Sequence, residues 1–168
     1  MSTVRRVVAL AISLSCSGCF SLMGDAQAGA VSSTRFVDGR YGVAGQVAGG
    51  FNFGSDTDAE HAGLGADARL KVTGDVQQVG VGPHVYLLFG SFATPYARVG
   101  ATLLEAGSVD GAASFGALGP RGELGVFLGP LVLSTFAEWD LRWTRQRNEG
   151  FVGAMIGVGT AVSTAPFH

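Results

Sequence analysis

The residues best suited to chemistry are a histidine, a serine and two carboxylates in the second half of the chain. His84 could act as a base, Glu138 or Asp140 could orient it, and Ser134 could serve as a nucleophile. Together these residue types would suit a hydrolase or an acyltransferase. No motif places a serine beside a histidine, however, so we predict no catalytic residue and no enzymatic activity.

A structural role accounts better for the ionisable side chains, because both signs of charge recur along the faces opposite the apolar residues. Charges in a dry interior are very costly unless they are paired, so carboxylates and arginines on such faces would have to neutralise one another. The predicted charge network consists of Arg40, Asp67, Arg69, His84, Arg98, Glu123, Glu138, Asp140 and Arg142. Lys71 and Arg121 fall on the same faces.

One acidic segment invites a metal-binding interpretation. Asp56, Asp58 and Glu60 alternate just before His61, and carboxylate oxygens at such spacing can converge on calcium. The segment lacks the glycine and the terminal glutamate of an EF-hand loop. We therefore interpret it as a solvated loop and predict neither a metal nor a cofactor.

Cys16 and Cys19 form a C-x-x-C pair, which would suggest redox or zinc chemistry in a cytosolic protein. They lie, however, in a segment with the layout of an export signal. Arg5 and Arg6 provide the positive end, and an apolar run, with Ser13 as its one polar residue, extends from Val7 to Leu14. The sequence has no second cysteine pair, so we do not expect disulfides to stabilise the mature chain.

The end of the export signal is open to two interpretations. Ala26-Gln27-Ala28 is a small-x-small site, which predicts an export signal at 1–28 and a single β-barrel domain at 29–168. Ser17-Gly18-Cys19 instead resembles the end of a lipoprotein signal, although Cys16 stands where that motif prefers leucine.

Cleavage with lipidation could also occur at Cys16, after Ser13-Leu14-Ser15. A third possibility keeps Val7 to Met23 as an uncleaved anchor, but that stretch is short for a spanning helix and contains several small polar residues.

The elements that would position the ionisable residues are strands, because apolar residues recur with period 2 rather than 3.6. In Leu131 to Thr144, the odd positions are mostly apolar while Glu138, Asp140 and Arg142 take the even ones. The same alternation recurs in 40–53, 62–73, 78–90, 95–106, 121–128 and 152–162. An eighth strand could be Ala30 to Val37 or Ala112 to Leu118.

Composition indicates where the apolar faces of these strands lie. Charged residues make up 14% of the chain, against about 25% in a typical soluble domain, while apolar residues make up 47% and glycine occurs 27 times. The net charge of −2, without a basic patch, gives no basis for nucleic-acid binding. Small residues on the polar faces, and strands longer than those of globular sheets, favour an apolar exterior over a soluble β-sandwich.

Aromatic residues lie near strand ends on the apolar faces, as in the interfacial girdles of membrane barrels. They are Tyr41, Phe51, Phe53, Phe89, Trp139 and Trp143.

Over roughly residues 35 to 164, this strand pattern resembles the small eight-stranded outer-membrane β-barrel class. The resemblance implies an all-β fold, an antiparallel up-and-down meander closed into a small transmembrane β-barrel, in the bacterial outer membrane and in contact with its lipid. Eight strands leave no open channel. The chain departs from the class at Pro166-Phe167-His168, where many members end on an aromatic residue.

We therefore expect a non-enzymatic barrel with a structural, surface or adhesive role. Two alternatives stay open: a membrane-embedded enzyme like the barrels that modify lipid A, and a lipid-anchored periplasmic β-sandwich that binds a partner. The sequence identifies no soluble partner.

Overall fold

The computed structural model describes residues 20–34, 41–53, 60–89, 93–116, 118–143 and 148–163, and within these ranges every regular element is a β-strand. The strands are β1 (Phe20–Ser33), β2 (Tyr41–Phe53), β3 (Glu60–Thr73), β4 (Val76–Phe89), β5 (Ala93–Thr102), β6 (Leu104–Val109), β7 (Ala112–Gly116), β8 (Gly119–Leu128), β9 (Leu131–Asp140) and β10 (Glu149–Ser163). No helix in this part of the chain is long and apolar enough to cross a membrane.

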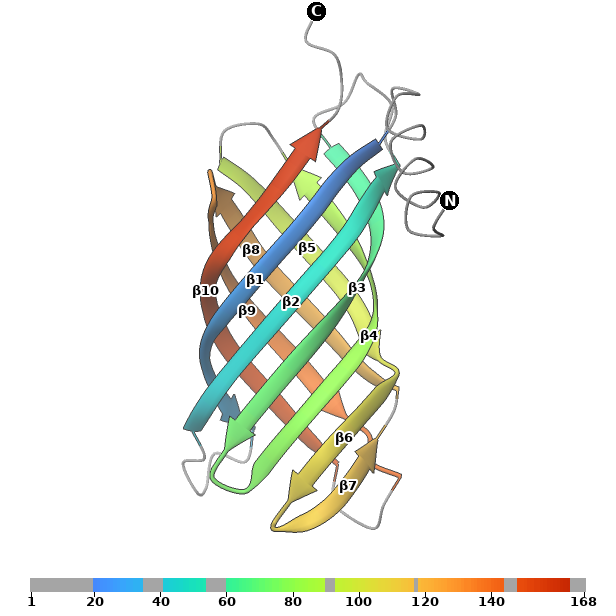
Figure 1. The fold of residues 1–168 in the computed structure, drawn as a ribbon, viewed down its shortest axis with the longest axis vertical. Helices are drawn as coiled ribbons and strands as arrows, with labels where there is room; N and C mark the ends of the chain where they lie inside the picture. The colour runs from blue at the N-terminus through green and yellow to red at the C-terminus, as the bar shows by residue number, and fades with distance from the viewer. Residues whose placement is uncertain are drawn as a thin grey trace, which may run out of the picture.

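The strands form one antiparallel sheet that closes on itself. Most strands pair with their neighbours in the chain, β4 pairs with both β5 and β6, β5 pairs with β8, and β1 pairs with β10 to complete the circle. β6 continues β5, and β7 leads into β8, so the wall of the barrel has eight strands. Figure 1 shows these strands inclined to the long axis, with the β6–β7 hairpin projecting at the end opposite the start of β1. The predicted fold class, an up-and-down antiparallel barrel, is confirmed.

A β-bulge explains why β5 and β6 are separate elements. β4 pairs with β5 at His84↔Gly100 and with β6 at Val81↔Leu104, so the register shifts by one residue between the two pairings. Pro83 lies in the interrupted stretch, where its missing N–H leaves no ladder bond broken. The bulge directs Leu103 and Leu104 both outward and returns Glu105 to the lumen.

Two-residue turns join several strand pairs. Asp110 and Gly111, with φ of 51° and 74°, connect β6 to β7 as a type I′ turn requires. Gly129, with φ of 62°, begins the Gly129-Pro130 turn between β8 and β9. β1 begins and β10 ends at the same end of the barrel, and the Gly129-Pro130 turn lies at that end too.

The distribution of side chains is the reverse of that in a soluble barrel. Apolar side chains on every wall strand are exposed, among them Val47 at 63%, Leu124 at 65% and Val158 at 64%. Tyr41, Phe51, Trp139 and Trp143, all predicted for the interfacial girdles, are exposed as well. This closed barrel with an apolar exterior rules out the β-sandwich alternative, whose apolar faces would be buried between two sheets.

The eighth strand is β1, and it starts ten residues before the candidate Ala30–Val37, overlapping positions 20–28 of the predicted export signal. The other candidate, Ala112–Leu118, supplies β7 and the link into β8, so it extends an existing wall strand.

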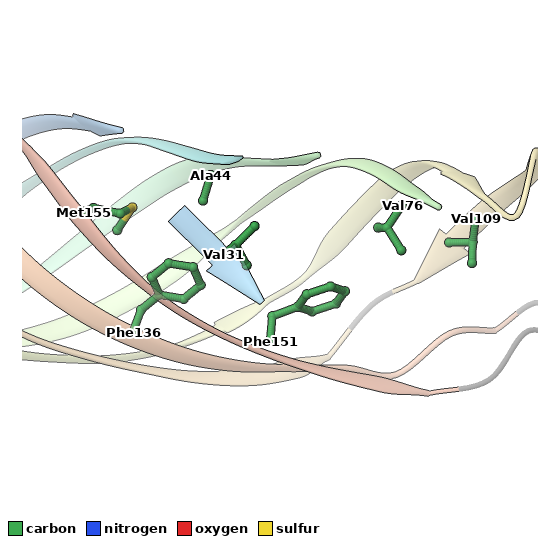
Figure 2. Packing of buried hydrophobic residues seen from close by; sticks show 7 residues of the cluster. All are labelled: Val31, Ala44, Val76, Val109, Phe136, Phe151 and Met155. Atoms are coloured by element: carbon green, nitrogen blue, oxygen red, sulfur yellow. The ribbon is translucent and has the colours of Figure 1, made fainter. Parts of the chain in front are cut away.

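Two apolar clusters lie inside the barrel. One contains Met23, Tyr86, Leu88, Tyr96, Phe127 and Val132. The other contains Val31, Ala44, Val76, Val109, Phe136, Phe151 and Met155, whose side chains point from several strands toward the barrel interior in Figure 2.

Candidate functional site in the barrel lumen

The structure places the predicted charge network inside the barrel, apart from Arg40, which lies outside the described residues. Asp67, Arg69, His84, Arg98, Glu123, Glu138, Asp140 and Arg142 are all buried. Alternation along the strands is the cause: each of these residues lies on the face opposite the exposed apolar side chains. Lys71 and Arg121 are buried with them.

Glu123 on β8 is the centre of the largest group of contacts. Its carboxylate accepts hydrogen bonds from Arg98 at 3.1 Å, from Arg69 at 3.1 Å and from the Tyr96 hydroxyl at 2.6 Å. Two opposite walls are joined in this way, since Arg69 belongs to β3 and Glu123 to β8. Asp25 on β1 accepts a second bond from Arg98, and Gln27 donates to both Asp25 and Glu123.

Lys71, the single lysine of the sequence, lies among three carboxylates. Its Nζ is 2.7 Å from Glu105, 2.6 Å from Asp140 and 3.4 Å from Glu138. The oxygens of these three carboxylates are close enough to one another to share a metal ion. The lysine ammonium lies within 3.4 Å of all three, so a cation already occupies the centre of this cluster.

His84 pairs with a different carboxylate from the one the enzymatic interpretation requires. Its Nδ1 is 2.9 Å from Asp67 Oδ2, and Arg121 donates to the same oxygen. Ser134 donates to Gln27 Oε1 at 2.7 Å. The proposed constellation of His84 with Glu138 or Asp140 and Ser134 is therefore not formed among these contacts.

Arg142 extends the polar contacts toward the end of the barrel that carries the β6–β7 hairpin. Its guanidinium lies 3.4 Å from Glu149 and donates to Gln78 at 3.1 Å. Glu149 in turn accepts from Ser33. β1, β4 and β10 are thus tied together beside the loops.

Rings and glycines complete the filling of the lumen. Arg69 and Lys71 stack over Phe136 and Phe151, with 4.8 and 4.6 Å to the ring centroids. The Phe136 ring lies against Gly153, where an added Cβ would stand 2.5 Å from it. Glycine at this position makes room for a ring from the neighbouring strand.

Several buried polar residues of the lumen are absent from the network predicted from the sequence, each for a physical reason. Asp25 and Gln27 lie within the predicted export signal at 1–28, so the sequence did not place them on a strand facing the lumen. Glu105 follows the bulge, which reverses the alternation established by the preceding residues. Two adjacent leucines, Leu103 and Leu104, are the signal that could have revealed the bulge. Glu149 lies outside the predicted strand at 152–162, whereas it begins β10.

The comparisons with known proteins agree on the fold. No protein-family model matches the chain, and no curated protein matches it. Among solved structures, Neisserial surface protein A (NspA) is similar with a TM-score of 0.55 and 16% identity, over 85% of this chain and 97% of that one. The outer membrane enzyme PagL is similar with a TM-score of 0.54 and 14% identity, over 83% of this chain and 99% of that one. The chain has the fold of these small outer-membrane barrels.

Proposed function

We propose that this chain is a non-enzymatic, membrane-spanning barrel of the bacterial outer membrane that holds its loops at the cell surface. The observation that carries the proposal is the inverted distribution of side chains, with an apolar exterior around a closed, ion-paired lumen. An exterior of this kind is stable against lipid and unstable in water. In the closed wall, β1 to β5 and β8 to β10 each pair with a neighbour on both sides, which meets the need of lipid for paired backbone groups.

The lumen supports a structural rather than a transport or catalytic role. In the described part of the chain, each predicted arginine and carboxylate lies within bonding distance of an oppositely charged side chain from another strand. Contacts across the barrel, such as Arg69 to Glu123, fasten opposite walls together. Side chains that are already paired in this way are poor candidates for binding a passing solute.

The test is heat-modifiability combined with fractionation. The full chain would be expressed in a Gram-negative host, and the outer-membrane fraction washed with salt and alkali. We expect the chain to stay in that fraction and to migrate differently on a denaturing gel before and after boiling. Release by the washes, or identical mobility of both samples, would contradict the proposal.

The two ends of the barrel differ in a way that suggests its orientation. The β6–β7 hairpin projects at the end opposite the start of β1, where β1 also ends and β2 begins, with seven residues of sequence between them, and where β9 ends and β10 begins, with eight residues between them. Outer-membrane barrels carry long loops outside and short turns in the periplasm. We infer that the β6–β7 hairpin faces the cell exterior.

Epitope insertion tests this orientation. A short epitope between Asp110 and Gly111 should be stained by antibody on intact cells. The matched control carries the same epitope between Gly129 and Pro130, and it should be stained only after the outer membrane is opened. Staining in the reverse order would contradict the inferred orientation.

A lipid-modifying enzyme is the second candidate, favoured by the similarity to PagL, which is an enzyme. His84 with its partner Asp67 is the pair closest to a catalytic arrangement, and the His84 Nε2 atom has no hydrogen-bond partner. The enzymatic hypothesis predicts that His84→Ala abolishes a change in lipid A composition caused by expressing the parent chain. We expect parent and variant to leave the same lipid A profile, which mass spectrometry of extracted lipid A would measure.

A further inference from the structure

The position of β1 has a consequence for export. β1 runs from Phe20 to Ser33 and pairs with β2 on one side and β10 on the other. The small-x-small site at Ala26-Gln27-Ala28 lies in the middle of this strand. Cleavage there would leave only Gly29 to Ser33 of the strand that closes the barrel.

The backbone loss would be large. Positions 45–53 of β2 and 156–163 of β10 would lose the strand between them. Each unpaired N–H or C=O group in the hydrocarbon region of a bilayer is very costly, which is why spanning sheets are closed. A chain that begins at Gly29 would therefore expose two open edges to lipid.

The lumen would also lose residues that the rest of the barrel uses. Met23 is 3% exposed within an apolar cluster. Asp25 is an ion-pair partner of Arg98. Gln27 accepts from Ser134 and donates to Asp25 and Glu123. Residues of a discarded signal have no reason to complete the interior of the mature fold.

We propose that export cleavage falls upstream of β1, between Leu14 and Phe20. Small residues suited to a signal peptidase follow the apolar run directly, at Ser15, Ser17 and Gly18. A signal ending there still has a length within the usual range of about 15–30 residues. This inference rests on the proposed function, since it concerns a chain that is exported and assembled as a barrel.

The first experiment determines the N-terminus of the protein purified from the outer membrane, by intact mass and by sequencing the N-terminal peptide. We expect the first residue to lie between Ser15 and Phe20. The mass separates a lipid-modified Cys19 or Cys16 from an unmodified N-terminus, and either form supports the proposal. A chain that begins at Gly29 or elsewhere within β1, or one that keeps Met1, would overturn it.

Two variants give independent evidence. The Ala28 side chain is exposed on the outer face, so Ala28→Leu should leave the barrel intact while blocking the downstream site. We expect Ala28→Leu to be processed like the parent; accumulation of unprocessed precursor would overturn the proposal. Asp25→Ala should lower the temperature of the gel mobility shift by roughly 10 °C, because it removes a partner of a buried arginine.

If residues 20–28 were discarded, the mature Asp25→Ala protein would be identical to the parent and the temperature would not move. The mobility shift of the parent is read in the same samples. Loss of that shift would contradict the membrane barrel itself, whereas a normal shift with an N-terminus at Gly29 would contradict only the cleavage site.

Discussion

On strand β9, consecutive side chains face the outer wall and the lumen in turn. The outer positions carry mostly apolar residues, and several of the inner positions carry polar or charged ones. Leu133 and Trp139 point outward and are exposed, whereas Ser134, Glu138 and Asp140 point inward and are buried. The proposed surroundings of the outer wall are lipid, which requires only an apolar surface. The lumen depends on named partners at hydrogen-bonding distance.

The difference shows which substitutions each region tolerates. If the outer wall faces lipid, as proposed, one apolar residue can replace another there, since lipid adapts to its shape. A lumen residue belongs to a set of matched charges, so losing one member leaves its partners buried without compensation. The two regions should therefore respond to different kinds of mutation, and the substitutions below are ordered by expected effect.

Lys71→Met should have the largest effect. It removes the cation from among Glu105, Glu138 and Asp140 and leaves an unbranched side chain that is shorter by one heavy atom. Breaking a buried ion pair by removing one partner costs about 3–5 kcal/mol. Unfolding by urea in detergent, followed by gel mobility, would measure the loss.

Glu105→Gln added to Lys71→Met provides the control, since it removes one of the stranded charges. We expect this double variant to recover part of the lost stability. If it proved less stable than Lys71→Met, the carboxylates would not be the source of the penalty.

Val47→Lys probes the outer wall at the midpoint of β2, where the side chain is 63% exposed. A lysine facing the middle of a bilayer costs about 2–4 kcal/mol, and the cost falls to about 0–1 kcal/mol near the interface. The matched control is Tyr41→Lys at the end of the same strand. Equal stabilities of the two variants in lipid vesicles would mean that this face does not lie in a membrane.

Strand length and the small residues on the polar faces predicted a barrel rather than a β-sandwich, while alternation predicted the strands and the two faces of most of them. β9 shows why: ten consecutive residues alternate without interruption, so every side chain can be assigned to a face. At the β5–β6 junction the bulge adds one residue to the wall strand and reverses the assignment for Glu105. β1 was missed in part because a small-x-small pattern within it also matches a cleavage site.

The partners of the lumen residues could not be predicted from the sequence. Alternation assigns a side chain to the inner face, but its height along the barrel axis depends on the stagger between strands, which no local pattern specifies. His84 illustrates the limit. The sequence supplied Glu138 and Asp140 as candidate acids, whereas the β3–β4 register brings Asp67 next to it.

Gly153→Ala tests the steric side of the lumen. An added methyl group would stand 2.5 Å from the Phe136 ring and from the Ala30 carbonyl oxygen. Overpacking of this kind costs about 1–3 kcal/mol. The control is Gly122→Ala, where an added Cβ meets nothing within 4 Å. Similar urea midpoints for the two variants would show that ring-to-glycine packing does not limit stability.

Ser134→Ala and Thr135→Ala give the smallest expected effects and the sharpest contrast between the two regions. Ser134 faces the lumen and donates to Gln27, so its loss should cost about 1 kcal/mol. Thr135 is exposed on the outer wall, and removing its hydroxyl group from a lipid-facing position should leave stability unchanged or raise it slightly. The two residues are adjacent on β9, so both substitutions are made in the same strand. A greater loss for Thr135→Ala than for Ser134→Ala, measured in the same vesicles, would reverse the assignment of the two faces.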